Sequence, residues 1–193
     1  MSKIVDFKYC FRCGNKLKNI PPVTCDNCHN RFWLNSKPCG AALVYNTTGL
    51  LLVKRNIDPF FDYWDIPGGH CDLGEHPGIT AIRECFEETG IKIVLTGILG
   101  CWISSGKDES GNLILPTLCI YYFAIPSLKN VNLKASTESS EVCFFKYDKL
   151  PKKIAFPEHQ IPVLQAWKRS IESGDAKTPL LDVTNITSSR FII

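Results

Sequence analysis

Residues 69–91 read GHCDLGEHPGITAIRECFEETGI, a polar turn followed by a helix-forming segment. Pro77 suits the first position of a helix, where its missing N–H costs nothing. Gly90 suits the position just past a helix end. Between these two residues the sequence predicts a helix of about three turns at ~100° per residue.

The predicted helix has an acidic face and an apolar face. The acidic face carries Glu84, Glu87 and Glu88. The opposite face, which we expect to pack on the core, carries Ile79, Ile82 and Phe86. Like charges at this spacing repel, and Arg83 can offset only one of them. A solvated acidic face is one explanation. A hard divalent cation is another, because Mg²⁺ takes carboxylates together with substrate phosphates.

The turn and helix together resemble the Nudix box, whose pattern is Gly, five residues, Glu, seven residues, Arg-Glu-apolar-x-Glu-Glu-x-Gly-apolar. The matching residues are Gly69, Glu75, Arg83, Glu84, Glu87, Glu88, Gly90 and Ile91. Cys85 occupies an apolar position of the pattern, and a buried cysteine behaves as a small hydrophobe. The pattern is long enough to favour the phosphate-chemistry interpretation over a solvated face.

The resemblance implies hydrolysis of a nucleoside diphosphate linked to another moiety, by attack of water on phosphorus, with Mg²⁺ (or Mn²⁺) as catalytic cofactor. It implies that Glu84 and Glu88 are the principal metal ligands and that Glu87 shares a second ion. The backbone carbonyl at Gly68-Gly69 would complete the metal site. Glu75 would support the box by hydrogen bonding or through a distal metal, and Arg83 would orient Glu87. Outside the box, Glu141 matches a late-strand Glu of the family that is a metal ligand or a base, and Glu138 competes for this role.

Substrate contacts are less specific in the sequence. The stacking candidates are Trp64, Tyr63, Phe60 and Trp102, although core packing explains each of them as well. Arg55 and Lys54 can meet phosphates or solvent. His70 and His159 lack metal-site spacing.

The N-terminal segment reads Cys10-x2-Cys13-x11-Cys25-x2-Cys28. Each Cys-x2-Cys pair can place two thiolates on one tetrahedral metal, so the spacing predicts a closed, structural Zn²⁺ site in a small zinc ribbon. Redox pairs or unrelated thiols are the alternatives. A segment this small has little core, so the metal is expected to supply most of its folding energy. The other six cysteines stand singly, and we expect them to be buried thiols.

Composition indicates a soluble globular protein. The chain has 193 residues, 45% of them hydrophobic, with a net charge of +3. No apolar run approaches the ~18 residues of a membrane span, and the start lacks the apolar region of a signal peptide. We therefore expect a cytoplasmic location, with a processed organellar precursor as the alternative, and no membrane partner. Residues 1–38 hold seven Lys/Arg against two Asp, a charge of +5. This charge attracts phosphate-bearing partners or, as we favour, offsets a zinc–thiolate centre.

The predicted organisation is a zinc ribbon and linker over 1–38, a Nudix domain over 39–173 and a tail over 174–193. Expected strands cover 40–45 and 50–55 as a hairpin, then 91–103, 113–125 and 142–145, with a late helix over about 158–173. This order predicts an α/β fold, an α/β/α sandwich with a mixed sheet, and the resemblance implies the same. The loop 104–112 is a candidate substrate lid or dimer edge, so a homodimer is left open.

The ribbon, linker and box together look like zinc-ribbon Nudix proteins, which include NADH pyrophosphatases and ADP-ribose/FAD pyrophosphatases. The Ser-Gln-Pro-Trp-Pro-Phe-Pro segment of NADH pyrophosphatases is absent, and this region reads GCWISSG over 100–106. The resemblance therefore favours ADP-ribose, FAD or a related dinucleotide, giving AMP and a phosphorylated product. The alternative is a nucleic-acid-binding or regulatory protein that senses a nucleotide or processes RNA ends. Nucleic acid is not expected, because sustained basic-aromatic interleaving is lacking.

Overall fold

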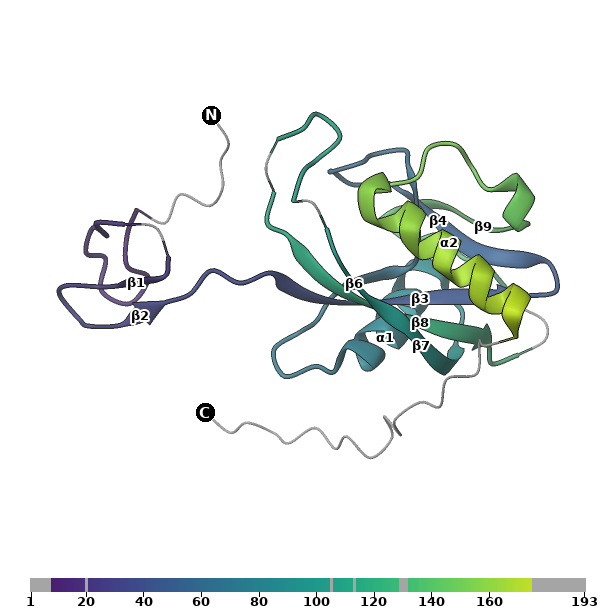
Figure 1. The fold of residues 1–193 in the computed structure, drawn as a ribbon, viewed down its shortest axis with the longest axis horizontal. Helices are drawn as coiled ribbons and strands as arrows, with labels where there is room; N and C mark the ends of the chain where they lie inside the picture. Colours follow the sequence, from purple (N-terminus) through teal and green to yellow (C-terminus); the bar gives the residue numbers. More distant parts are fainter. Residues whose placement is uncertain (1–7, 20, 105, 113, 129–131, 175–193) are drawn as a thin grey trace.

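The computed structural model describes residues 8–174 apart from 20, 105, 113 and 129–131 (Figure 1). The elements in chain order are β1 (Val23–Thr24), β2 (Arg31–Phe32), β3 (Lys37–Asn46), β4 (Gly49–Arg55), β5 (Trp64–Asp65), β6 (Gly68–His70), α1 (Pro77–Thr89), β7 (Ile93–Ile103), β8 (Thr117–Pro126), β9 (Ser139–Phe145), the 3₁₀ turn η1 (Tyr147–Lys149) and α2 (Pro157–Ser173). The predicted hairpin, strands and helices are present, although β8 starts at Thr117, later than expected.

The main sheet is mixed, as predicted. Its strand order is β5-β4-β3-β8-β7, with β6 paired to β3 and β9 to β4. β3 and β8 run parallel, and the other pairs run antiparallel. β3 pairs with β4 only at Tyr45 and Asn46, and with β6 over Cys39–Ala41. The sheet therefore opens between β3 and β4, and β6 brings Gly68 and Gly69 into this opening.

The two helices cover opposite faces of the sheet, which gives the expected sandwich (Figure 1). Successive residues of β3 and β8 point to alternate faces and are buried on both, so these strands read as continuous apolar runs. Val163, Leu164 and Trp167 of α2 pack on one face. Ala81 and Cys85 of α1 pack on the other.

Helix α1 has the predicted ends but a different core face. Pro77 is its first residue, and Gly90 follows it in the left-handed conformation (φ 73°). Ile79 and Phe86 are 42% and 49% exposed, so their predicted burial is wrong. Ile82 packs only partly against the core. The buried residues of this helix are Gly78, Thr80, Ala81, Cys85 and Thr89.

The core face of α1 is small because this helix lies very close to β3. A Cβ on Gly40 would stand 1.9 Å from the carbonyl oxygen of Pro77. Only small side chains fit between backbones at this separation, so the large apolar residues turn outward. The same close approach brings the acidic face of α1 to the opening beside β6.

The ribbon is a separate small unit at the N-terminal end. It contains the β1–β2 hairpin and a core of Cys10, Leu17, Cys25 and Phe32. The four sulfur atoms of Cys10, Cys13, Cys25 and Cys28 lie within 4.8 Å of one another, which fits the predicted zinc ribbon. Of the single cysteines, Cys101 and Cys143 are exposed, contrary to expectation, because they lie on the outermost strands β7 and β9. The predicted tail lies outside the described residues except for Gly174. Within the part of the chain that the structure describes, no helix is long and apolar enough to cross a membrane.

Candidate active site

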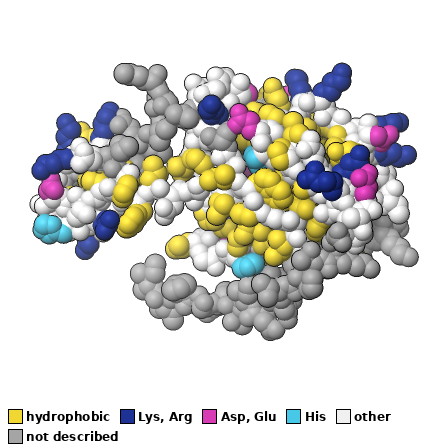
Figure 2. All heavy atoms as spheres, viewed as in Figure 1, with side chains coloured by type: hydrophobic (Ala, Val, Ile, Leu, Met, Phe, Trp, Pro, Cys, Tyr) yellow, Lys and Arg dark blue, Asp and Glu magenta, His cyan; other side chains and the backbone are white. Residues whose placement is uncertain are grey.

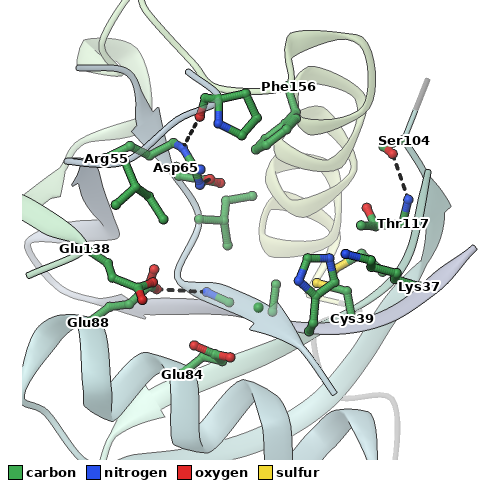
Figure 3. A pocket seen from close by; sticks show the side chains of 18 of the residues that line it. Lys37, Cys39, Arg55, Asp65, Glu84, Glu88, Ser104, Thr117, Glu138 and Phe156 are labelled. Carbon is green, nitrogen blue, oxygen red and sulfur yellow. Dashed lines mark hydrogen bonds and ion pairs between the residues drawn. The ribbon is translucent and has the colours of Figure 1, made fainter. Parts of the chain in front are cut away.

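A pocket of about 800 Å³ opens beside β6, between the acidic face of α1 and the start of α2. Figure 3 shows Glu84, Glu88 and Glu138 together on one side of this pocket, and Phe156 on another. The strand ends of β3, β4 and β8 complete the wall. The pocket is therefore lined by segments that are far apart in the sequence.

Two glycines of β6 allow the carboxylates to reach the pocket. The N–H of Gly68 donates to Oε2 of Glu88 at 3.1 Å. A Cβ on Gly69 would stand 2.3 Å from Oε1 of Glu84, so any side chain there would displace this carboxylate. The close contact between β6 and α1 explains why glycine is needed in this turn.

The protein leaves the negative charge of the pocket incompletely compensated. Burial raises the pKa of Glu84. Burial also raises the pKa of Glu88 well above its ordinary value, and the negative charge of Asp65 raises it further. Among the described residues, Gly68 is the only hydrogen-bond donor to the Glu88 carboxylate. Buried carboxylates need a partner charge. An oxygen-rich, acidic site of this kind fits a hard divalent cation.

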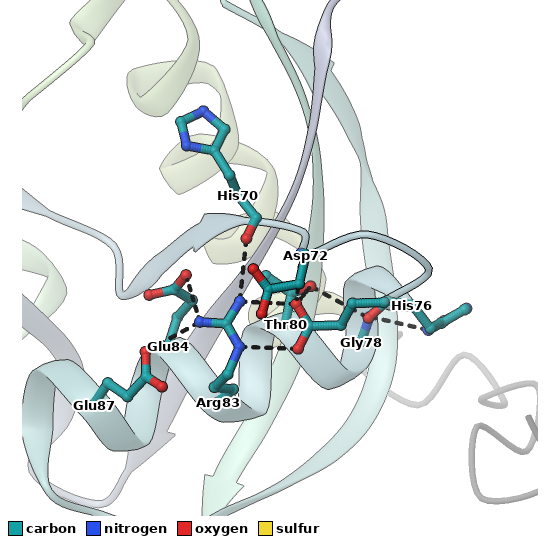
Figure 4. A network of polar contacts seen from close by, with 9 residues as sticks. His70, Asp72, His76, Gly78, Thr80, Arg83, Glu84 and Glu87 are labelled. Atoms are coloured by element: carbon teal, nitrogen blue, oxygen red, sulfur yellow. Dashed lines mark hydrogen bonds and ion pairs between the residues drawn. The ribbon is translucent and has the colours of Figure 1, made fainter. Parts of the chain in front are cut away.

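Arg83 organises the turn before α1 (Figure 4). Its Nε and Nη2 donate to the two oxygens of Glu75 at 2.9 and 2.8 Å, and its Nη1 donates to Glu84 and Glu87 at 2.9 and 3.0 Å. Glu75 also accepts from the N–H of Asp72 and from the hydroxyl of Thr80. The hydrogen bonds from Arg83 hold the pKa of Glu75 down at about 2. Both oxygens of the Glu75 carboxylate already accept hydrogen bonds from the protein, so Glu75 holds the turn in position.

Comparison with known proteins shows to which family the chain belongs. The NUDIX domain model matches residues 37–167, well over half of the chain. The chain belongs to the NUDIX domain family. It is thus a Nudix pyrophosphohydrolase, as the box predicted.

Two relatives and one solved structure illustrate the similarity. An ADP-ribose pyrophosphatase of Methanocaldococcus jannaschii is 28% identical over 131 residues, which cover 68% of this chain and 73% of the relative. An RNA pyrophosphohydrolase of Agrobacterium fabrum is 40% identical over 65 residues, but these cover only 30% of this chain and 38% of the relative. A NUDIX hydrolase of Nitrosomonas europaea has a similar structure, with a TM-score of 0.68 and 22% identity over 89% of this chain and 94% of the other. This last similarity shows the shared fold.

The structure brings most of the expected Nudix residues to the pocket and separates others from it. The lining includes Gly68, Gly69, Arg83, Glu84, Glu87, Glu88 and Arg55. Glu141 lies outside the lining and pairs with Lys54 at 2.9 Å, whereas Glu138 lies within it. Lys54 also pairs with Asp62, at 2.8 Å.

The aromatic candidates lie outside this Nudix pocket. Trp64 packs edge-on against Phe145 at 4.7 Å, and Trp102 packs edge-on against Tyr121 at 5.7 Å. Tyr63 packs against Phe60 at 5.5 Å, beside a smaller neighbouring cavity that both line. Trp64 and Trp102 therefore pack against the main core, whereas Phe60 and Tyr63 line the smaller cavity.

Sequence reasoning missed the wall contributed by β5 and the start of α2. Asp65 accepts from Nη1 of Arg55 at 2.9 Å and from the side-chain amide of Gln160. His159 forms a 2.9 Å hydrogen bond with the hydroxyl of Tyr121, and burial lowers its pKa. Phe156 completes the wall. The only local signal was a charged residue, Asp65, inside an otherwise apolar segment, and none marked the start of α2 as part of the site.

Proposed function

We propose that the protein is a Mg²⁺-dependent pyrophosphatase that hydrolyses a nucleoside diphosphate linked to another moiety, with ADP-ribose or FAD as the substrate class. The products would be AMP and a phosphorylated partner. The observation that carries the proposal is the presence of Glu84 and Glu88 in one pocket of about 800 Å³. This volume suits a ligand of dinucleotide size. The ADP-ribose pyrophosphatase of M. jannaschii supports the choice of substrate.

The donor set fits the proposed cation. Glu84, Glu88 and Glu87 would hold Mg²⁺, together with a backbone carbonyl at Gly68-Gly69. When bound, Mg²⁺ neutralises charge on phosphoryl oxygens and makes a bound water more acidic. The buried carboxylates with raised pKa values support this assignment, because the cation would supply the positive charge that the protein itself does not provide.

Arg55 would hold the diphosphate. Its Nε donates to the carbonyl oxygen of Pro59 at 2.8 Å, and its Nη1 donates to Asp65 at 2.9 Å. A guanidinium has five N–H donors in a rigid fork, so these two bonds fix its position and leave donors for phosphate oxygens. Arg55 would bind and orient the substrate beside the metal site.

Glu138 is our candidate for the base that accepts a proton from the attacking water. It lies in the pocket near Glu88, whereas Glu141 is ion-paired outside it (Figure 3). In the ribbon, Cys10, Cys13, Cys25 and Cys28 would hold a structural Zn²⁺, whose role is folding.

A substrate panel tests the proposal. Turnover would be measured at fixed Mg²⁺ on ADP-ribose, FAD, NAD⁺, NADH, a diadenosine polyphosphate and capped RNA. We expect ADP-ribose or FAD to be hydrolysed far faster than the others. Glu88→Gln should lower turnover by more than about a hundredfold, because it removes a charged metal ligand. Glu172→Gln, an exposed change at the end of α2, is the matched control. Near-normal turnover of Glu88→Gln would refute the metal assignment, and blank-level rates on all six substrates would refute the proposed function.

A further inference from the structure

The ribbon exposes three aromatic rings that are not among the buried residues of its core. Tyr9, Phe11 and Trp33 are 61%, 80% and 59% exposed. The ribbon core is completed without them, by two cysteines, Leu17 and Phe32. Large exposed rings on so small a unit indicate a contact surface, because single scattered apolar residues are normal but a concentration of them is not.

Two of these rings are held in defined positions. Phe11 stands edge-on against Phe32, with centroids 4.6 Å apart. Phe32 is buried at the end of β2, so its neighbours Arg31 and Trp33 point away from the core. The Arg31 guanidinium lies 4.3 Å from the centroid of the Trp33 ring. A cation stacked on an exposed indole is an arrangement that also stacks on nucleobases.

The segment that carries the aromatic rings is also basic. The described ribbon and linker residues carry six exposed cations: Lys8, Arg12, Lys16, Lys18, Arg31 and Lys37. Asp26 is the one acidic residue among the described residues from 8 to 38, and it pairs with Lys18 at 2.8 Å. Even with the −2 charge of one Zn²⁺ and four thiolates, the ribbon stays basic. Figure 2 shows dark blue side chains bordering this unit.

Contrary to the expectation from the sequence, we infer that the ribbon binds single-stranded nucleic acid, with its cations on the phosphates and Phe11 and Trp33 stacking on bases. Single strands offer unstacked base faces beside a regular row of phosphates, and the ribbon offers rings beside cations. An acidic protein partner would match the positive charge of the ribbon but would not offer base faces on which its aromatic rings could stack. A duplex hides its base faces. The inference does not rest on the proposed function, because binding is measured without turnover.

The linker extends the basic surface to the Nudix domain. Lys37 begins β3 and lines the catalytic pocket. A strand bound on the ribbon would therefore meet a cation at the mouth of the pocket. The ribbon would then act as a binding module for a strand whose end lies near the Nudix carboxylates.

The test is binding of the full-length, zinc-loaded protein to a fluorescent single-stranded RNA of about twelve nucleotides and to an abasic oligonucleotide of the same length. We expect RNA to bind at least about fivefold more tightly than the abasic strand, since stacking contributes this much or more per base. Phe11→Ala with Trp33→Ala should weaken RNA binding to the abasic level. Trp33→Phe should retain most of the affinity. Phe61→Ala, which removes an equally exposed ring outside the ribbon, is the matched control and should change nothing.

A second pair of measurements tests the phosphate interactions and the competing partners. In Arg12→Gln with Lys16→Gln, the slope of log affinity for RNA against log salt concentration should become shallower by roughly 0.7 for each phosphate that is no longer neutralised. Equal affinity for RNA, the abasic strand and polyglutamate would overturn the inference in favour of non-specific charge attraction. Unchanged RNA binding by the double aromatic variant, with zinc content and circular dichroism intact, would overturn it as well.

Discussion

At the scale of single residues, Arg83 determines how the box turn is arranged. Its guanidinium holds both oxygens of Glu75 and contacts Glu84 and Glu87. It also donates to the carbonyl oxygen of His70 at 3.1 Å. One side chain therefore ties the turn to α1 and sets the direction of the carboxylates. Its role is positioning, because its donors are already occupied by the protein.

Glu75→Gln should weaken this arrangement without removing a metal ligand. We expect the Mg²⁺ concentration for half-maximal turnover to rise by about ten- to a hundredfold, as for other residues that orient metal ligands. The decrease in thermal stability of the variant should depend on pH. The ion pair lowers the Glu75 pKa from 4.5 to about 2, so its stabilisation is complete above pH 4.5 and disappears as the pH falls toward 2. An unchanged Mg²⁺ requirement, compared with Glu172→Gln, would contradict the positioning role.

At the scale of elements, the start of α2 forms a wall of the site and also anchors this helix on the sheet. His159 bonds to Tyr121 of β8 and is 7% exposed. Gln160 bonds to Asp65 of β5, which also pairs with Arg55. Helix α2 is thus joined by polar contacts to strands on both sides of the opening. Packing of Trp167 and Leu164 buries the rest of its inner face.

The anchoring by His159 predicts a pH dependence of stability. Burial lowers the His159 pKa below 6.5, so the folded state favours the neutral ring. Its contribution is therefore fully present above pH 6.5 and is lost as the pH falls below this value. In His159→Gln, the fall in thermal unfolding temperature between pH 8 and pH 5.5 should be smaller than in the unmodified protein. His29→Gln, at an exposed position, should retain the full fall. Equal falls in all three proteins would show that His159 does not protonate in this way.

At the scale of the whole molecule, the ribbon and the Nudix domain differ in what stabilises them. The Nudix domain has two large apolar clusters, one on each face of its sheet. The ribbon cluster contains only four buried residues, two of them cysteines. A core this small rarely supports a fold without a metal or disulfides, and the chain has free thiols at these positions.

Cys25→Ser should therefore unfold the ribbon selectively. We expect loss of bound zinc and rapid proteolysis within residues 1–38, while the main unfolding transition of the Nudix domain changes little. Zinc content and limited proteolysis measure the two effects. Cys101→Ser removes an exposed single thiol and should change neither. A Cys25→Ser protein with its full zinc content would refute the four-thiolate site.

Much of this protein follows from local sequence. The Nudix box, the paired cysteines, the caps of α1 and the β3–β4 hairpin each depend on residues close together in the chain, so spacing alone predicts them. The position of Glu138 in the pocket and of Glu141 outside it depends on how β9, β5 and α2 meet beside β6, and so does the wall formed by Phe156, His159 and Gln160. The outward turn of Ile79 and Phe86 likewise depends on how closely α1 approaches Gly40. Periodicity shows that a helix has two faces, but only packing against a particular strand selects the face that is buried.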